Sequence, residues 1–157
     1  MPATATVTLF PVAALPALRE AAEQRQPGAA QGTLRRTVAQ HGRPVAAYGW
    51  AGYVLATLLA CLEELRAITL DSDLDDLALG LAEKQNASFI FLTPEHRRWL
   101  PELEPARFTE QELCAYFNDF NECEEPDSGR PMLEGVGFLQ RAIAAVEPDT
   151  VGLLVIG

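Results

Sequence analysis

The run Asp71-Ser72-Asp73-Leu74-Asp75-Asp76 is the densest group of residues that can bind a metal or carry a reaction. Acids at alternate positions begin a calcium loop, which also requires glycine at its sixth position and glutamate at its twelfth. Asp76 and Ala82 hold those positions here, so the calcium motif fails. Paired aspartates after a strand also serve magnesium-dependent phosphotransfer, which makes Asp71 and Asp73 candidate ligands. The competing interpretation is a helix start, because the helix dipole favours acids in the first turn.

The two histidines, His41 and His96, give little support to catalysis. A Ser-His-Asp or Cys-His site needs a nucleophile in a recognisable context, and no GxSxG motif is present. We expect both histidines at the surface. His96 is nevertheless the residue that would join Asp71 and Asp73 in a metal-dependent hydrolase.

Cysteine usage indicates a reducing compartment. Cys61, Cys114 and Cys123 are odd in number and form no CxxC pair, which disfavours a disulfide scaffold and a zinc cluster. We therefore predict free thiols and a cytoplasmic location, and the first residues show no basic leader region. No cofactor is predicted.

A second acidic group follows an amphipathic helix. Its members, with no base before Arg130, are Asp119, Glu122, Glu124, Glu125 and Asp127. One interpretation is a solvated face and loop. The other is a docking surface for a basic protein partner, whose encounter opposite charge would accelerate.

The charge of the chain is distributed unevenly. The net charge is −10. Residues 1–60 carry five arginines and two glutamates, a net of +3, whereas residues 61–157 carry seven bases and twenty acids, a net of −13. Such an acidic surface repels phosphate, so nucleic acid is not an expected partner. It suits a basic protein, and a homodimer is left open.

Hydrophobic periodicity predicts alternating strands and helices. Strands are expected at 4–10, 33–39, 45–48, 67–70, 88–92 and 151–156, the second and third as a hairpin. Helices are expected at about 12–25, 51–66, 71–85, 94–100, 110–121 and 132–146. The nearly all-apolar C-terminal strand is typical of a strand covered on both faces.

These elements predict one domain over residues 1–157 and an α+β fold, with α/β as the alternative. We expect a mixed sheet with a buried C-terminal strand, packed by about six helices. Residues 45–62 contain no charged side chain, and this uncharged run is just long enough to span a membrane. A buried core helix is the preferred interpretation, and no membrane partner is expected.

Tyr48-Gly49-Trp50, the long apolar helix after it and a short strand ending at Asp71 resemble small bacterial immunity proteins of toxin–immunity systems. The resemblance covers residues 45–75 and implies a cytosolic, non-enzymatic inhibitor of a cognate toxin. Two hypotheses therefore stand. The first is a non-catalytic protein-binding or inhibitory module, and the alternative is a small metal-dependent hydrolase or phosphotransfer enzyme using Asp71 and Asp73.

Overall fold

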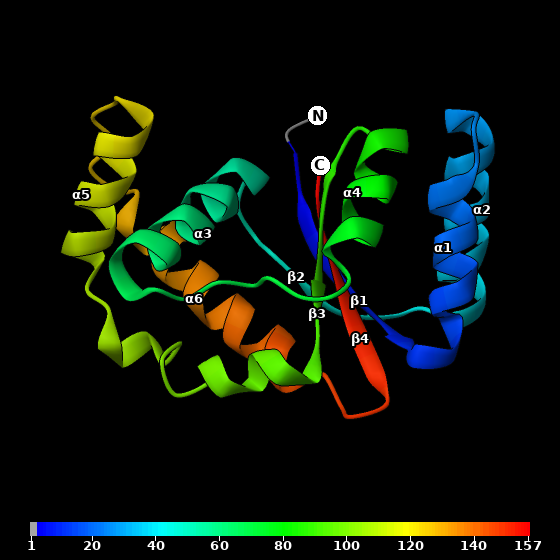
Figure 1. Cartoon of the computed structure of the whole chain (residues 1–157). Helices are drawn as coiled ribbons and strands as arrows, with labels where there is room; N and C mark the ends of the chain where they lie inside the picture. Colours follow the sequence, from blue (N-terminus) through cyan, green and yellow to red (C-terminus); the bar gives the residue numbers. More distant parts are fainter. Residues whose placement is uncertain (1–2) are drawn as a thin grey trace.

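The computed structural model describes residues 3–157 as an α+β fold, as predicted (Figure 1). Its sheet has four strands in the order β2-β1-β4-β3. All three pairings are antiparallel, whereas the sequence led us to expect a mixed sheet. The strands are β1 (Ala5–Pro11), β2 (Arg43–Ala47), β3 (Ser88–Leu92) and β4 (Thr150–Ile156).

The helices of the described residues account for most of the remaining chain. The α-helices are α1 (Leu15–Glu23), α2 (Pro27–His41), α3 (Gly52–Arg66), α4 (Asp75–Lys84), α5 (Glu110–Asn121) and α6 (Gly129–Ala144). Short 3-10 helices lie at η1 (Val12–Ala14), η2 (Pro94–Trp99) and η3 (Pro105–Arg107).

The C-terminal strand β4 is interior to the sheet, as its apolar sequence predicted. It pairs with β1 on one side and β3 on the other. Its side chains alternate between two hydrophobic cores, because successive side chains of a strand point to opposite faces. Leu154 packs in one core, and Val151 and Leu153 pack in the other.

The two faces of the sheet are covered by different helices. In Figure 1, α3, α5 and α6 lie on one side of the sheet, and α1, α2 and α4 lie on the other. The first face of β1 presents Ala5, Val7 and Leu9 to the larger core. The second core gathers around three aromatic side chains, Phe10, Phe89 and Phe91. A three-layer arrangement results, with the sheet in the middle.

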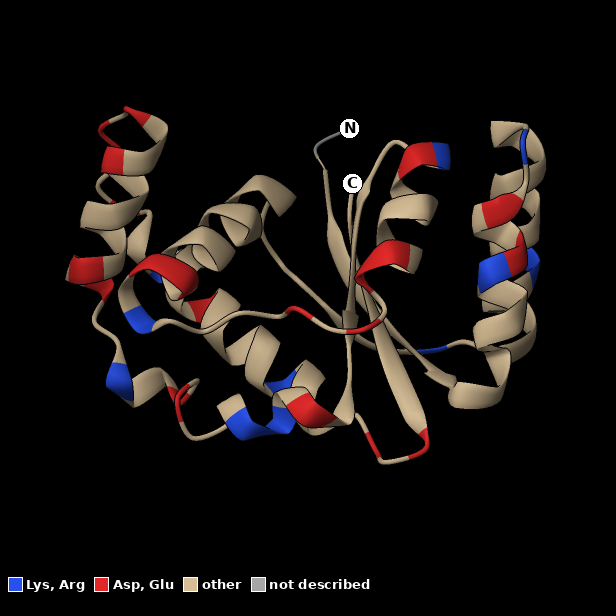
Figure 2. Cartoon of the chain, viewed as in Figure 1, with Lys and Arg blue, Asp and Glu red and all other residues tan. Residues whose placement is uncertain are grey.

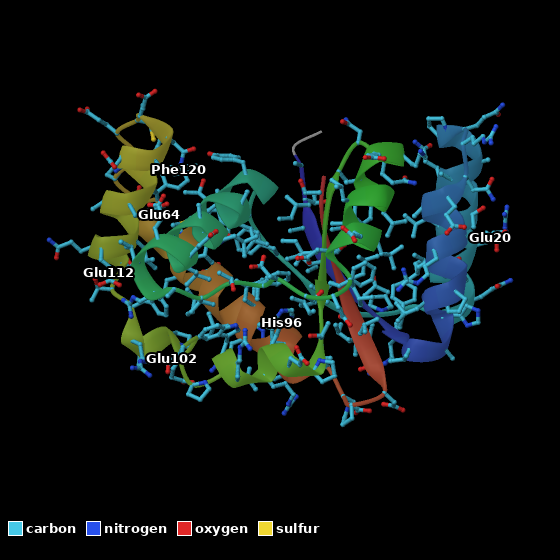
Figure 3. The ribbon with its side chains drawn as sticks, in the orientation of Figure 1. Glu20, Glu64, His96, Glu102, Glu112 and Phe120 are labelled. Atoms are coloured by element: carbon cyan, nitrogen blue, oxygen red, sulfur yellow. The ribbon has the colours of Figure 1, made fainter. Side chains whose placement is uncertain are left out.

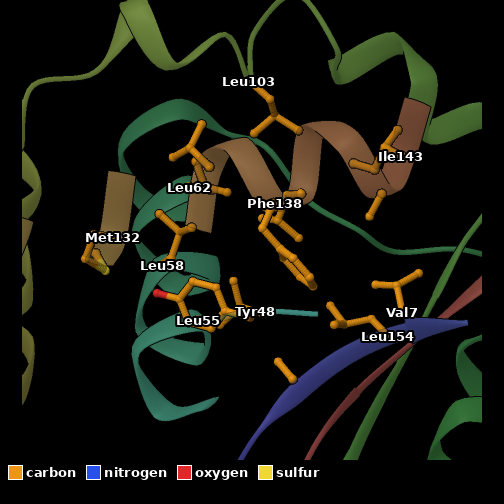
Figure 4. Packing of buried hydrophobic residues seen from close by; sticks show 14 of the residues in the cluster. Val7, Tyr48, Leu55, Leu58, Leu62, Leu103, Met132, Phe138, Ile143 and Leu154 are labelled. Carbon is orange, nitrogen blue, oxygen red and sulfur yellow. The ribbon is translucent and has the colours of Figure 1, made fainter. Parts of the chain in front are cut away.

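Helices α3 and α6 approach closely in the larger core (Figure 4). A Cβ atom placed on Gly135 of α6 would lie 2.7 Å from Leu58 Cδ2, so glycine permits this approach. The buried Tyr48 hydroxyl donates a hydrogen bond to the Pro131 carbonyl oxygen at 2.6 Å. Burial, together with the nearby Glu134 carboxylate, raises the pKa of Tyr48.

Two predicted strands are wrong. Residues 33–39 belong to α2, where the buried side chains Ala30, Thr33 and Thr37 follow helical spacing but are too small or polar to give a clear apolar signal. Residues 67–70 form no strand, because Ala67 takes a left-handed conformation (φ 53°) as the C-cap of α3. The 68–71 segment is held instead by side chains of η2: Trp99 Nε1 donates to the Thr69 carbonyl oxygen at 2.9 Å.

The uncharged run at residues 45–62 is divided between β2 and α3. Leu55, Leu58 and Leu62 of α3 are buried in the larger core, which agrees with the predicted core helix. No helix within residues 3–157 has the length and apolar character that crossing a membrane requires.

Replacing Leu58 by alanine tests this core. Leu58 is 0% exposed, whereas Leu65 on the same helix is 54% exposed. We expect Leu58→Ala to lower the free energy of unfolding by about 2–5 kcal/mol, because a cavity remains where the side chain packed. Leu65→Ala should change it by less than about 0.5 kcal/mol. Urea denaturation of both variants measures the difference, and a loss for Leu65→Ala as large as that for Leu58→Ala would contradict the assigned core face of α3.

Candidate functional site

The first candidate group, Asp71, Asp73 and His96, does not form a converging site. Asp71 and Asp73 are exposed, and α4 begins only at Asp75. Asp75 and Asp76 are the acids of its first turn, where the helix dipole favours them. The Asp75 carboxylate accepts a hydrogen bond from the Ser72 N–H at 3.2 Å. The acidic run therefore stabilises the start of a helix.

His96 was expected at the surface, and this expectation is wrong. His96 is 1% exposed, because η2 turns its ring beneath the 68–71 segment (Figure 3). Its Nδ1 accepts from the Thr93 N–H at 2.9 Å, and its Nε2 lies 2.9 Å from the Asp71 carbonyl oxygen. A carbonyl can only accept, so Nε2 carries the proton. Both ring nitrogens are engaged by backbone, which leaves neither for a metal or a substrate.

The described residues contain no group of three or more His, Cys, Asp or Glu side chains that could hold a metal ion. The thiols are free, and Cys61 is buried. Burial, reinforced by the Glu112 carboxylate, raises the pKa of the Cys61 thiol to about 11. That thiol stays protonated at neutral pH and is a poor nucleophile.

Substituting His96 separates a structural role from a metal site. His96→Leu leaves the Thr93 N–H and the Asp71 carbonyl without partners, so we expect a loss of about 1–3 kcal/mol for each. Asp71→Asn should change stability by less than about 0.5 kcal/mol, because only the backbone of Asp71 is used. Urea denaturation, repeated with Mg²⁺ and Zn²⁺, measures both effects. A metal-dependent gain in stability that Asp71→Asn abolishes would contradict this assignment.

The second candidate group gathers at the C-terminal end of α5 and in the loop that follows (Figure 2). We call its five acids the acidic tip. All five are exposed, and none takes part in an ion pair within residues 3–157: Asp119, Glu122, Glu124, Glu125 and Asp127. Their mutual repulsion is therefore relieved only by water and salt.

The loop of the acidic tip is held by side chains at its base. Asn118 Oδ1 accepts from the Glu125 N–H at 2.9 Å, and Asn118 Nδ2 donates to the Glu125 carbonyl at 3.2 Å. The Ser128 hydroxyl also donates to that carbonyl at 2.9 Å. Glu122 is the left-handed C-cap of α5 (φ 52°), a conformation that favours glycine or asparagine. The carboxylates thus project from a fixed backbone.

Exposed aromatic side chains lie beside the acidic tip, along the seam between α3 and α5. Tyr53 is 58% exposed and Phe120 is 51% exposed; Phe120 is labelled on α5 in Figure 3. The Tyr53 ring packs against Phe117 at 6.0 Å, and Phe120 stacks on Tyr116 at 5.7 Å. Hydrogen bonding fixes this pair further, since the Tyr116 hydroxyl donates to the Glu64 carboxylate at 2.9 Å. Tyrosine and phenylalanine exposed on fixed supports are typical of protein interfaces.

Sequence reasoning found the acids of this surface but missed its aromatic part. The positions of Leu113, Tyr116, Phe117 and Phe120, at i, i+3, i+4 and i+7, place all four on one apolar helix face, yet Phe120 is exposed. The sequence pattern therefore carries no signal for the exposure of Phe120. Asn118, Cys114 and Ser128, which support the loop, have no distinctive sequence pattern.

No protein-family model, no curated protein and no solved structure matches the chain.

Proposed function

We propose that this protein is a non-catalytic protein-binding module whose partner presents a basic surface to the acidic tip. The observation that carries the proposal is that exposed Tyr53 and Phe120 lie beside five acids, at the end of α5 and on the fixed loop after it, that form no ion pair within residues 3–157. Aromatic rings supply buried apolar area at little entropic expense, and the acids select the sign of the partner's charge. A fixed loop also avoids the ordering penalty of binding.

The proposed place of action is the cytoplasm, where the three free thiols would stay reduced. Inhibition of a basic toxin is the narrower form of the proposal and rests on the resemblance of residues 45–75 to immunity proteins. In the fold, Tyr48 and Trp50 of that segment have hydrogen-bond partners. Trp50 Nε1 donates to the Glu134 carboxylate at 2.5 Å, and Tyr48 bonds to Pro131. The broader function, protein binding, is the one that the acidic tip and its aromatic neighbours support.

Photo-crosslinking identifies the partner, and charge reversal tests how it is recognised. A benzophenone amino acid replaces Phe120, and in a control chain it replaces Val12, which is 43% exposed in η1 directly before α1. Helix α1 lies on the opposite side of the sheet from α5 (Figure 1). The partner joined at position 120 but not at position 12 is identified by mass spectrometry and purified. Its association rate is then measured with the parent chain and with Glu122→Lys/Glu124→Lys/Glu125→Lys.

We expect the triple reversal to slow association by about tenfold or more at low salt, and the two rates to converge as salt screens the charges. The matched control, Glu20→Lys/Glu23→Lys/Asp149→Lys, changes the net charge equally at exposed positions on α1 and directly before β4. It should slow association far less. If both triple variants slow association equally, the effect is explained by net charge alone. If the triple reversal at the acidic tip leaves the association rate at the parent value, the proposal is overturned.

The strained C-cap provides a separate prediction. Glu122→Gly relieves the left-handed conformation, so we expect the free energy of unfolding to rise by about 1 kcal/mol. The same substitution removes one acid and should slow association with the crosslinked partner. Ala67→Gly is the control, because Ala67 has the same left-handed conformation (φ 53°) and no charge. It should raise stability and leave association unchanged; no gain in either variant would contradict the assigned backbone strain.

A further inference from the structure

Strand β3 is an edge of the sheet whose outer side has no strand beside it. Thr4 and Gly157 exchange two backbone hydrogen bonds, of 3.3 and 2.9 Å, and such pairs alternate along an antiparallel ladder. Odd-numbered residues of β4 therefore bond to β1, and even-numbered residues bond to β3. Ile90 is paired with Leu154 and so bonds to β4. The N–H and C=O of Phe89 consequently point away from β4, toward the open edge.

This edge forms the floor of a groove of about 550 Å³. Helix α3 borders the groove on one face of the sheet, and α4 borders it on the other. The 68–71 segment crosses the edge and closes one end (Figure 1). Within residues 3–157, no backbone hydrogen bond from another segment reaches Phe89 from the groove side. Phe89 lines the groove, and its backbone N–H and C=O face the space between two apolar walls.

The two edges of the sheet differ in protection. Strand β2 carries Arg43 and Pro44, and its pairing with β1 is irregular between Val7 and Thr8. Charge, proline and irregular pairing all discourage the addition of another strand. The β3 sequence Ser-Phe-Ile-Phe-Leu has none of these features. Leu79 on α4 also stands in the groove with 62% of its surface exposed.

The charges along the groove select its occupant. Glu63, Asp71 and Asp75 line it; within residues 3–157 no base lines it and none of the three is in an ion pair. A second copy of this chain would place the same three acids opposite one another, which is unfavourable. A segment that carries lysine or arginine would find complementary charge there.

We propose that the β3 groove binds an extended, basic segment of a partner protein, which adds to the sheet as a fifth strand. Backbone hydrogen bonds to Phe89 hold the segment, as in other cases of strand addition. Alternate side chains of the segment point to opposite faces, one set toward α3 and the other toward α4. Apolar side chains fill the walls near Leu79, and basic side chains reach Glu63 and Asp71. This site is separate from the acidic tip and does not depend on it.

The proposal is tested with a random dodecapeptide display library selected on the immobilised full chain. A selected peptide is synthesised, and its Kd is measured by fluorescence anisotropy against the parent and four variants. Leu79→Lys blocks the apolar wall, and Leu65→Lys is its control on an exposed leucine outside the groove. Glu63→Lys/Asp71→Lys reverses the charge of two acids that line the groove, a change that we call the rim reversal. Glu20→Lys/Glu23→Lys is the control with the same change in net charge.

We expect selected peptides to alternate apolar residues with lysine or arginine. Leu79→Lys and the rim reversal should each weaken binding at least tenfold, and the two controls by less than threefold. Peptides are methylated on the backbone nitrogens of every second residue, at either the odd or the even positions. Methylation at one parity should abolish binding and methylation at the other should be tolerated, because only alternate N–H groups face β3. In hydrogen exchange, the Phe89 amide should exchange faster than the Ile90 amide in the free chain and become protected with peptide.

Three outcomes would overturn the proposal. The first is that no peptide is enriched, or that enriched peptides bind Leu79→Lys as well as the parent. The second is equal sensitivity to methylation at both parities, which would exclude strand addition. The third is a dimer of the parent chain in light scattering that Leu79→Lys converts to monomer, which would assign the groove to a second copy. Crosslinking at position 120 should be unchanged in Leu79→Lys, so failure of this proposal is distinguishable from failure at the acidic tip.

Discussion

Strand β4 is hydrogen-bonded on both of its edges and packed on both of its faces. Among the described strands, β2 and β3 are edges, and the second face of β1 is packed only at Phe10, because Thr6 is exposed and Thr8 is half-buried. Each helical layer packs on residues of β4, so the layers are joined through it. Because β4 comes last in the chain, the native sheet closes only when residues 150–156 insert between β1 and β3. Long-range pairing of this kind is slow to form, and it makes the two cores interdependent.

With both faces of the sheet covered, the surfaces that remain for binding lie at its margins. One is the open edge of β3, and the other is the end of α5, the helix farthest from the sheet in Figure 1. The contacts of α5 are with α3 and α6 rather than with the strands. Substitutions on the outer face of α5 should therefore disturb the proposed recognition with little effect on the cores. At β3 the opposite holds, because Phe89 and Phe91 are core residues whose backbone forms the edge.

The parts of this fold that were predictable are those with a strong apolar signal. Helix α3 carries large apolar side chains at helical spacing and strand β4 is a nearly continuous apolar run, so type and position followed from the sequence. Residues 33–39 of α2 were predicted as a strand because the buried positions of this helix hold alanine and threonine. The burial of these side chains depends on the closeness of α1. The helix expected at 12–25 ends at Glu23, and Pro27 is the first residue of α2, where its missing N–H is harmless. His96 was misplaced because its burial depends on the 68–71 segment crossing over it, a contact between residues 25 apart.

The candidate binding surfaces likewise include one part that the sequence predicts and one part that it does not. Acidic character is a property of composition, and the exposure of Glu124 and Glu125 follows from the cost of burying a charge. An edge strand cannot be recognised in this way, because Ser-Phe-Ile-Phe-Leu and Val-Gly-Leu-Leu-Val-Ile are both apolar runs that fit a central strand. Only strand order assigns the first to the edge and the second to the centre. Strand β3 is apolar because its side chains fill the two cores. Its place at the edge of the sheet then leaves its outer backbone groups open to the proposed partner.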